Sequence, residues 1–194
     1  MVNSFDLKHP IIVLFLCISM LSNAQVNSPF SISISYFGEM ITHPGLKLSF
    51  NFSLKHWEKG QNMESIYFSI SAGTFLHRQY QKGLFIIPEL NYGRQLSNRD
   101  FVTTGIGFGS LHAIVPNTYE LDPISGEVSK VRTSHNYFLS GCSFSYGKEV
   151  MQNKKISNNV FIRPSFMYAF PNFPKGIGYI NMELGSTFNK TENE

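Results

Sequence analysis

Cysteine is scarce in this chain of 194 residues, which contains only Cys17 and Cys142. Cys17 lies in a segment that we expect to be cleaved off, so the mature chain has one cysteine and cannot form an internal disulfide. Charge is also low, because Lys, Arg, Asp and Glu make up 15% of the residues and the formal net charge is +3. Lys154-Lys155 is the only adjacent pair of Lys or Arg residues, and no cluster of them lies on one face that would favour nucleic acid as a partner.

The chain also lacks a long apolar run and a sustained helical pattern. Its clearest apolar stretch, Ile11 to Leu21, is too short to cross a bilayer as a helix. Lys8 and His9 precede this stretch and Ser22-Asn23-Ala24-Gln25 follows it, a pattern typical of a signal peptide cleaved after Ala24. A membrane anchor and a buried strand are the alternatives for this segment. Residues 1–24 are therefore expected to be removed.

What the chain does contain is period-two alternation, in which a large apolar side chain is followed by a small or polar one. Such alternation predicts strands with one face in an apolar environment, and each run has the roughly 9–11 residues that a tilted membrane strand needs. Eight strands are predicted, near Phe30–Gly38, Leu46–Lys55, Ser65–Leu76, Leu84–Arg94, Phe101–Leu111, Asn136–Lys148, Val160–Phe170 and Gly178–Phe188.

The longest connection between these strands runs from Ala113 to Ser134 (residues 113–134). It contains three turn signals, Pro116-Asn117, Asp122-Pro123 and Ser125-Gly126, without a sustained pattern, so we expect a connection without strands. In small membrane barrels both chain ends lie on the periplasmic side. The connection follows the fifth strand, so counting from the N-terminus places it outside the cell.

The two faces of the strands differ in a way that favours a membrane barrel over a soluble, lipocalin-like barrel. One face carries small residues such as Thr103, Gly105 and Gly107, whereas a water-facing surface should be rich in charge. The other face is large and apolar, and aromatic residues suited to interfacial girdles lie toward strand ends: Tyr36, Tyr92, Tyr146, Tyr168 and Phe170. Two sets of residues depart from this pattern. Four apolar residues fall on the lumen face: Phe85, Ile87, Phe161 and Met167. Pro88 and Pro164 lie inside strands, and we interpret them as bulge positions.

These patterns predict an all-β fold, an eight-stranded antiparallel up-and-down transmembrane β-barrel that follows a cleaved signal peptide. The barrel would occupy residues 25–188, and residues 189–194 would form a polar tail. The chain resembles small outer-membrane barrels of the OmpA/OmpX type, and in particular the outer-membrane β-barrel proteins of Bacteroidetes. The residues that carry the resemblance are Asn23-Ala24-Gln25, His43-Pro44-Gly45-Leu46-Lys47, Glu89-Leu90-Asn91-Tyr92-Gly93-Arg94 and Gly105-Ile106-Gly107-Phe108-Gly109. The resemblance implies a location in the cell outer membrane; one departure from it is that six residues follow Phe188.

Charged and amide side chains are predicted to meet inside the barrel. Glu89, Arg163 and Glu183 share the lumen phase near mid-barrel, with Asn51, Asn91 and Asn181 nearby. Because an eight-stranded barrel is only wide enough for side chains, we expect an ion network that plugs the lumen, with a gated polar path as the alternative. Arg163 could bridge both carboxylates, and the remaining negative charge would require a proton on one Glu or the help of Lys47.

Three histidines, His77, His112 and His135, lie near the outward strand ends and could bind a metal or serve as a catalytic base. Ser110 precedes His112 by two residues and Ser134 is adjacent to His135, but no compact signature of a lipid A deacylase is present. The sequence therefore predicts a non-enzymatic protein without a metal or other cofactor. A hydrolase or acyltransferase that modifies lipid A is the enzymatic alternative.

The predicted role is to present the 113–134 connection outside the cell or to dock a partner in the membrane. Outer-membrane lipid is the expected surrounding, a protein partner would bind through the external loops, and a monomer is expected. A periplasmic lipocalin-like lipid carrier is one rival, which would need a hollow apolar interior. A component of a larger secretion or uptake complex is another.

Overall fold

The computed structural model describes residues 30–39, 43–60, 62–77, 81–96, 99–121, 126–152, 156–171 and 176–190. All eight predicted strands are present, and most extend beyond their predicted ends. Their bounds are β1 Phe30–Glu39, β2 Gly45–Lys59, β3 Asn62–His77, β4 Gln81–Gln95, β5 Asp100–Leu121, β6 Val128–Gln152, β7 Ile156–Phe170 and β8 Ile177–Lys190. The predicted signal peptide, residues 1–24, lies outside the described residues, and β8 continues two residues past Phe188.

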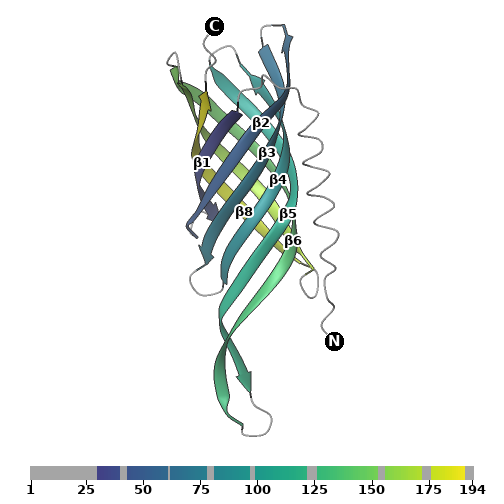
Figure 1. Ribbon diagram of the computed structural model, residues 1–194, viewed down its shortest axis with the longest axis vertical. Helices are drawn as coiled ribbons and strands as arrows, with labels where there is room; N and C mark the ends of the chain where they lie inside the picture. The colour runs from purple at the N-terminus through teal and green to yellow at the C-terminus, as the bar shows by residue number, and fades with distance from the viewer. Residues whose placement is uncertain are drawn as a thin grey trace.

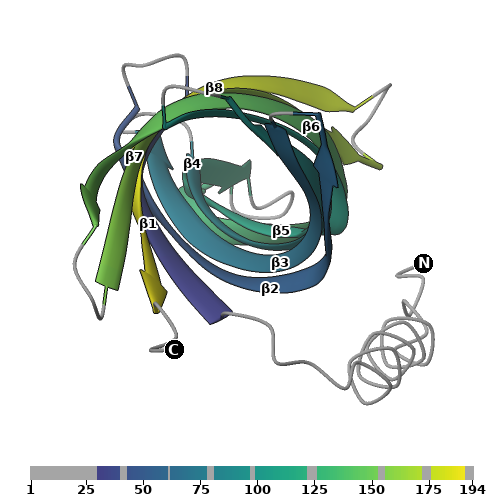
Figure 2. The same ribbon diagram turned by 90° about the horizontal axis from the view of Figure 1, so that it is seen from above.

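The strands form one closed barrel in which each strand pairs antiparallel with its neighbours in the chain. Pairing of β1 with β8 closes the ring, for example at Ile34 opposite Ser186. Figure 2, seen from above, shows the resulting ring. The predicted all-β, up-and-down fold is thereby confirmed. Among the described residues, no helix is long and apolar enough to span a bilayer.

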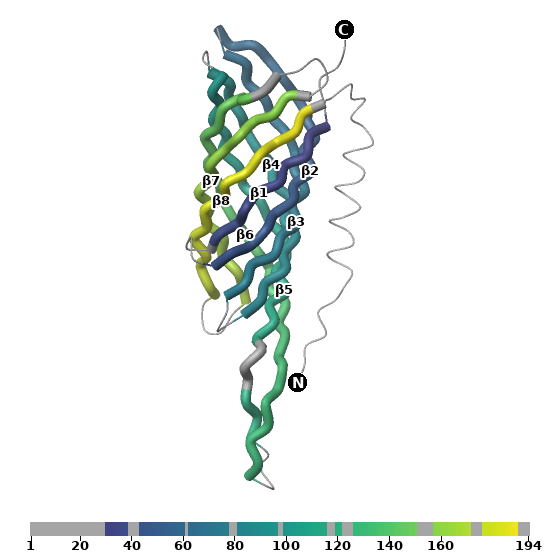
Figure 3. The backbone as a smooth tube through the Cα atoms, turned by 90° about the vertical axis from the view of Figure 1, so that its left-hand side faces the viewer, coloured from purple at the N-terminus to yellow at the C-terminus, as the bar shows by residue number. Residues whose placement is uncertain are grey.

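The barrel has two distinct ends. The terminal end holds the start of β1 at Phe30 and the end of β8 at Lys190, at the top of Figure 1. The outer end holds the connections that follow β1, β3, β5 and β7. Figures 1 and 3 show that β5 and β6 project far beyond the other strands at the outer end.

The prediction of a strand-free connection over 113–134 is wrong, because most of the described residues of this segment form a two-stranded ribbon. Pairing of β5 with β6 continues from the barrel to Leu121 opposite Val128. Pro116-Asn117, interpreted as a turn, instead lies where the register shifts between Val115 and Thr118. A bulge with one extra residue in β5 accommodates this shift, so the strand continues past the proline. We call β5 residues 115–121 and β6 residues 128–137 the ribbon.

The outward face of the barrel is broadly apolar. Ile106, Leu84, Leu90, Ile180 and Leu184 are each about half exposed, as are many other large apolar side chains of this face. Exposed aromatic residues lie toward both ends, with Tyr36 and Phe170 toward the outer end and Tyr92 and Tyr146 toward the terminal end. A continuous apolar belt between aromatic girdles is a surface for lipid rather than water, so the barrel is a transmembrane one.

The two prolines within the barrel wall do not mark bulges, contrary to the interpretation of the sequence. Pro88 pairs in register with Ile70, and Pro164 pairs in register with Met182. The β4–β5 ladder is interrupted beside Pro88 but resumes in the same register at Glu89 opposite Gly107. Each proline thus removes a hydrogen bond on one side of its strand without inserting an extra residue.

Candidate functional site

The lumen is the candidate site, and its side chains form three layers along the barrel axis. An apolar plug fills the outer end, a layer of buried charges lies at mid-barrel, and a polar cavity opens toward the terminal end. This arrangement differs from the predicted packed polar lumen in two respects. The outer third is apolar, and the terminal part is hollow because small residues such as Ser31, Ser33 and Gly93 line it.

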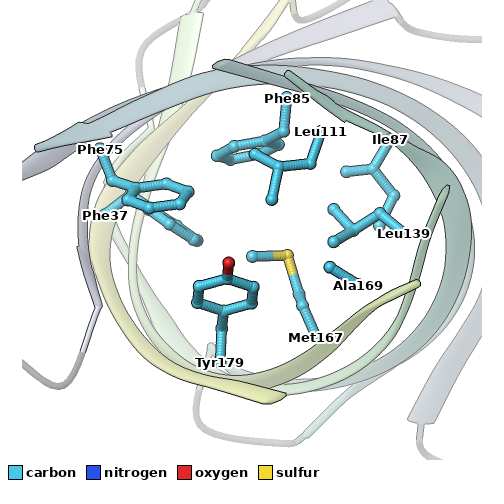
Figure 4. Close-up of a cluster of buried hydrophobic side chains, with 9 residues drawn as sticks. All are labelled: Phe37, Phe75, Phe85, Ile87, Leu111, Leu139, Met167, Ala169 and Tyr179. Carbon is cyan, nitrogen blue, oxygen red and sulfur yellow. The ribbon is translucent and has the colours of Figure 1, made fainter. Parts of the chain in front are cut away.

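The apolar plug closes the lumen at the outer end (Figure 4). The ring of Phe37 lies 5.0 Å from that of Phe85, and the ring of Phe75 lies 5.7 Å from that of Tyr179. Added Cβ atoms at Gly73 and Gly83 would clash with the rings of Phe85 and Phe75, so these glycines make room for the rings. The plug residues are Phe37, Phe75, Phe85, Ile87, Leu111, Leu139, Met167, Ala169 and Tyr179.

Three of the four apolar residues that departed from the lumen pattern have a place in this plug. Phe85, Ile87 and Met167 are each at most 5% exposed and belong to the plug. Their large side chains fill the space that small residues on neighbouring strands leave, as is usual inside a narrow barrel. Phe161 lies instead on the wall of the cavity. The plug thus excludes an open aqueous path through the described part of the barrel.

Lys47 is the centre of the buried charge layer. Its Nζ atom lies 3.3 Å from Oε2 of Glu89 and 3.1 Å from Oε1 of Glu183, and all three side chains are almost fully buried. Hydroxyl donors complete the layer, since Ser71 donates to Glu89 at 3.0 Å and Ser35 donates to Glu183 at 3.3 Å. Lys47 therefore holds β4 and β8 to β2 from inside the ring.

Arg163 does not bridge the two carboxylates, although the register places it opposite Glu183 as expected. Among the described residues it makes no ion pair and no hydrogen bond; its guanidinium lies over the ring of Phe161, 5.0 Å from the centroid. The structure gives the bridging position to Lys47 instead. The reason is geometric. The side chain of Arg163 is directed toward the start of β7, whereas the side chain of Lys47 extends across the lumen between both carboxylates.

The three predicted asparagines are separated along the lumen. Asn91 donates to Ser69 at 2.5 Å and Asn181 donates weakly to the carbonyl oxygen of Tyr179 at 3.4 Å. Their buried Oδ1 atoms have no hydrogen-bond partner among the described residues. Asn51 lies farther toward the terminal end, where it donates to Ser31 and Ser33. The amides therefore flank the charge layer rather than joining it.

The cavity at the terminal end has a volume of about 540 Å³ and is open to solvent. Most of its lining residues have polar or charged side chains, and they come from many strands. Arg163 and Phe161 form part of it, together with Tyr67 and Thr103. Neither this cavity nor the central position of Lys47 is predicted by the sequence. A signal for both existed, because serine and glycine dominate the lumen phase near this end and Lys47 shares that phase.

The structure does not bring the three predicted histidines together, and each contacts a different neighbour. Nδ1 of His112 donates to Oδ1 of Asn136 at 2.7 Å on the outward face, and Ser110 makes no hydrogen bond with His112. His77 stacks on His43, and His135 packs near Tyr137. In the part of the chain that the structure describes, no group of three or more His, Cys, Asp or Glu side chains could hold a metal ion.

Comparison of this fold with solved structures finds several bacterial β-barrel proteins. Neisserial surface protein A is 9% identical over 85% of this chain and 96% of its own, with a TM-score of 0.49. The outer membrane protein Ail of Yersinia pestis is 14% identical over 84% and 99%, with a TM-score of 0.42. The outer membrane enzyme PagL is 13% identical over 84% and 99%, with a TM-score of 0.39. At such values nothing about function carries over to this chain.

No protein-family model matches the chain, and no curated protein sequence matches it. The location of the protein follows from its own surface. A closed eight-stranded ring satisfies its backbone groups without water and presents an apolar belt between two aromatic girdles. This is the construction of barrels that reside in outer membranes, and the protein is accordingly an outer-membrane β-barrel.

Proposed function

We propose that this barrel is a non-enzymatic anchor that displays the ribbon of β5 and β6 outside the cell as a docking element for a protein partner. The observation that carries the proposal is the length of these two strands. Pairing of β5 with β4 ends at Ile114, and pairing of β6 with β7 begins only at Phe138. Beyond these positions, the described residues of the ribbon pair only with each other.

The ribbon has the features of a binding element. Its two outer edges carry unpaired backbone groups, to which an extended segment of a partner can add as a further strand. Tyr119, Leu121 and Val128 are each more than 60% exposed near its tip. These apolar side chains lie far from the lipid belt, so a protein partner is the surface that would cover them.

Three rival functions find less support. A lipid-modifying enzyme would need an activated nucleophile, but no hydrogen bond links Ser110 to His112. A lipocalin-like carrier would need a hollow apolar interior, whereas here the apolar plug is filled and the hollow part is lined mostly by residues with polar or charged side chains. A wide pore is also unsupported, because the plug closes the outer end. The relation to Bacteroidetes barrels in particular rests on sequence motifs alone.

The display of the ribbon can be tested by cysteine labelling of intact cells. In a background where Cys142 is replaced by serine, we expect Ser129→Cys in the ribbon to react with a membrane-impermeant maleimide. Lys59→Cys, which is exposed at the terminal end, is the matched control and should react only after the cells are opened. Labelling of Lys59→Cys but not of Ser129→Cys in intact cells would invert the topology and overturn the proposed role.

A further inference from the structure

The cavity at the terminal end contains a buried cation, Arg163, whose hydrogen-bond donors no described residue uses. Arg163 is only 9% exposed and lines the cavity, yet none of the described residues accepts a hydrogen bond from it. A guanidinium carries five N–H donors in a planar fork. We propose that this cavity is a binding site for a small soluble oxyanion, a phosphate or carboxylate group, which Arg163 anchors by a two-pronged hydrogen bond.

The two buried carboxylates do not occupy Arg163, because Lys47 and hydroxyl groups already engage them. Glu183 accepts from Lys47 and Ser35, and Glu89 accepts from Lys47 and Ser71. These carboxylates face a narrow space that they share with the plug residues Ile87 and Met167, on the side away from the cavity. They therefore offset the charge of Arg163 at a distance but leave its donors directed elsewhere.

The position of Arg163 over the ring of Phe161 sets the direction of its guanidinium. Phe161 precedes Arg163 by two residues on β7, so it lies on the same face and closer to the terminal end. The contact at 5.0 Å draws the guanidinium toward the cavity, and Phe161 itself forms part of the cavity wall. An aromatic ring that supports one face of a guanidinium leaves its edge free to bind an oxyanion.

The rest of the cavity suits an anion. Arg94 and Arg99 line it in addition to Arg163, and Glu149 is its only acidic lining residue among those described. Glu149 accepts a hydrogen bond from Ser157 at 2.7 Å, so it is already engaged at the rim. With His56 neutral, the lining carries a formal charge of +2, which favours the entry of anions.

The size and access of the cavity restrict the ligand class. A volume of about 540 Å³ lies within the range of roughly 300–1,000 Å³ that small-molecule sites occupy. The wall is a closed ring of paired strands, so a ligand can enter only from the aqueous terminal end and not laterally from the bilayer. This end faces the periplasm in the orientation proposed above. A lipid headgroup is therefore excluded as the source, and a soluble ligand is expected.

Anion-dependent thermal unfolding of the purified protein in detergent micelles tests the proposal. Inorganic phosphate should raise the unfolding temperature more than chloride at equal ionic strength, since a ligand that binds only the folded state stabilises it. Arg163→Gln should weaken phosphate binding by at least about tenfold, because it removes a charge-assisted double hydrogen bond. Arg94→Gln, at the rim, should weaken it only slightly. Equal effects of phosphate on the wild type and on Arg163→Gln would overturn the proposal.

A second measurement keeps Arg163 in place, in case its replacement prevents folding. Ser65 lines the cavity, so Ser65→Cys in a Cys142→Ser background provides a probe inside it. A negatively charged methanethiosulfonate reagent should modify this cysteine faster than a positively charged one. Phosphate should slow the reaction more than chloride does at equal ionic strength. Faster reaction of the positive reagent, or no protection by phosphate, would contradict an oxyanion site.

Discussion

Replacing Lys47 by methionine is expected to lower the free energy of unfolding by about 3–5 kcal/mol, because two buried carboxylates lose their shared cation. The Nζ atom of Lys47 lies within 3.3 Å of a carboxylate oxygen of both Glu89 and Glu183, and Lys47 is only 3% exposed. Methionine keeps most of the side-chain volume, so the loss would report charge rather than packing. Urea unfolding in detergent micelles, followed by the fluorescence of the single tryptophan, Trp57, measures the effect.

A triple variant provides the control for this prediction. Adding Glu89→Gln and Glu183→Gln to Lys47→Met removes the stranded charges and should recover a large part of the lost stability. Ser49→Ala, at a neighbouring lumen position of β2, should cost much less, because it removes only a hydroxyl that hydrogen-bonds to Ser71. If the triple variant is less stable than Lys47→Met, the stranded carboxylates do not cause the loss of stability in Lys47→Met.

A charge placed in the apolar belt is expected to cost about 2–4 kcal/mol or to block insertion into a bilayer. Ile106 lies in the middle of the barrel part of β5 and is 56% exposed. In water, arginine at such an exposed position would change stability little. In lipid the guanidinium must be removed from water, so Ile106→Arg should fold poorly in phospholipid vesicles.

The same substitution on the ribbon is the matched control. Leu121 lies on the same strand and is 62% exposed, but it is beyond the barrel at the outer end. Leu121→Arg should therefore insert and fold like the wild type. Equal folding yields of Ile106→Arg and Leu121→Arg in vesicles would mean that the belt around Ile106 does not face lipid.

The strands and the assignment of their faces could be predicted from the sequence because period-two alternation is a local property. Each residue of Leu46–Leu54 reveals its face through its neighbours, and the observed exposure of β2 alternates accordingly from Leu46 to Phe50. The ribbon was missed because turn-forming residues were given more weight than the strand pattern around them. Pro116-Asn117 favours a turn locally, but pairing with β6 carries the strand through.

The interior was harder to predict, because it depends on where long side chains extend in three dimensions. The register brings Arg163 and Glu183 opposite each other, as the sequence indicates, but backbone register does not determine which cation contacts a carboxylate. Lys47 reaches Glu183 across the β1–β2 pair, a contact that sequence separation conceals. The plug and the cavity likewise depend on summed side-chain volumes around the ring, which no single strand reveals.

The central claim is that this chain is an outer-membrane β-barrel, and gel mobility of the membrane fraction tests it most directly. Membranes washed with alkaline carbonate would be loaded onto a denaturing gel with and without prior heating. A closed barrel resists the detergent until it is heated, so the protein should remain in the washed membranes and the unheated and heated samples should migrate at different positions. Release of the protein into the soluble fraction, together with one unchanged band position, would contradict the account.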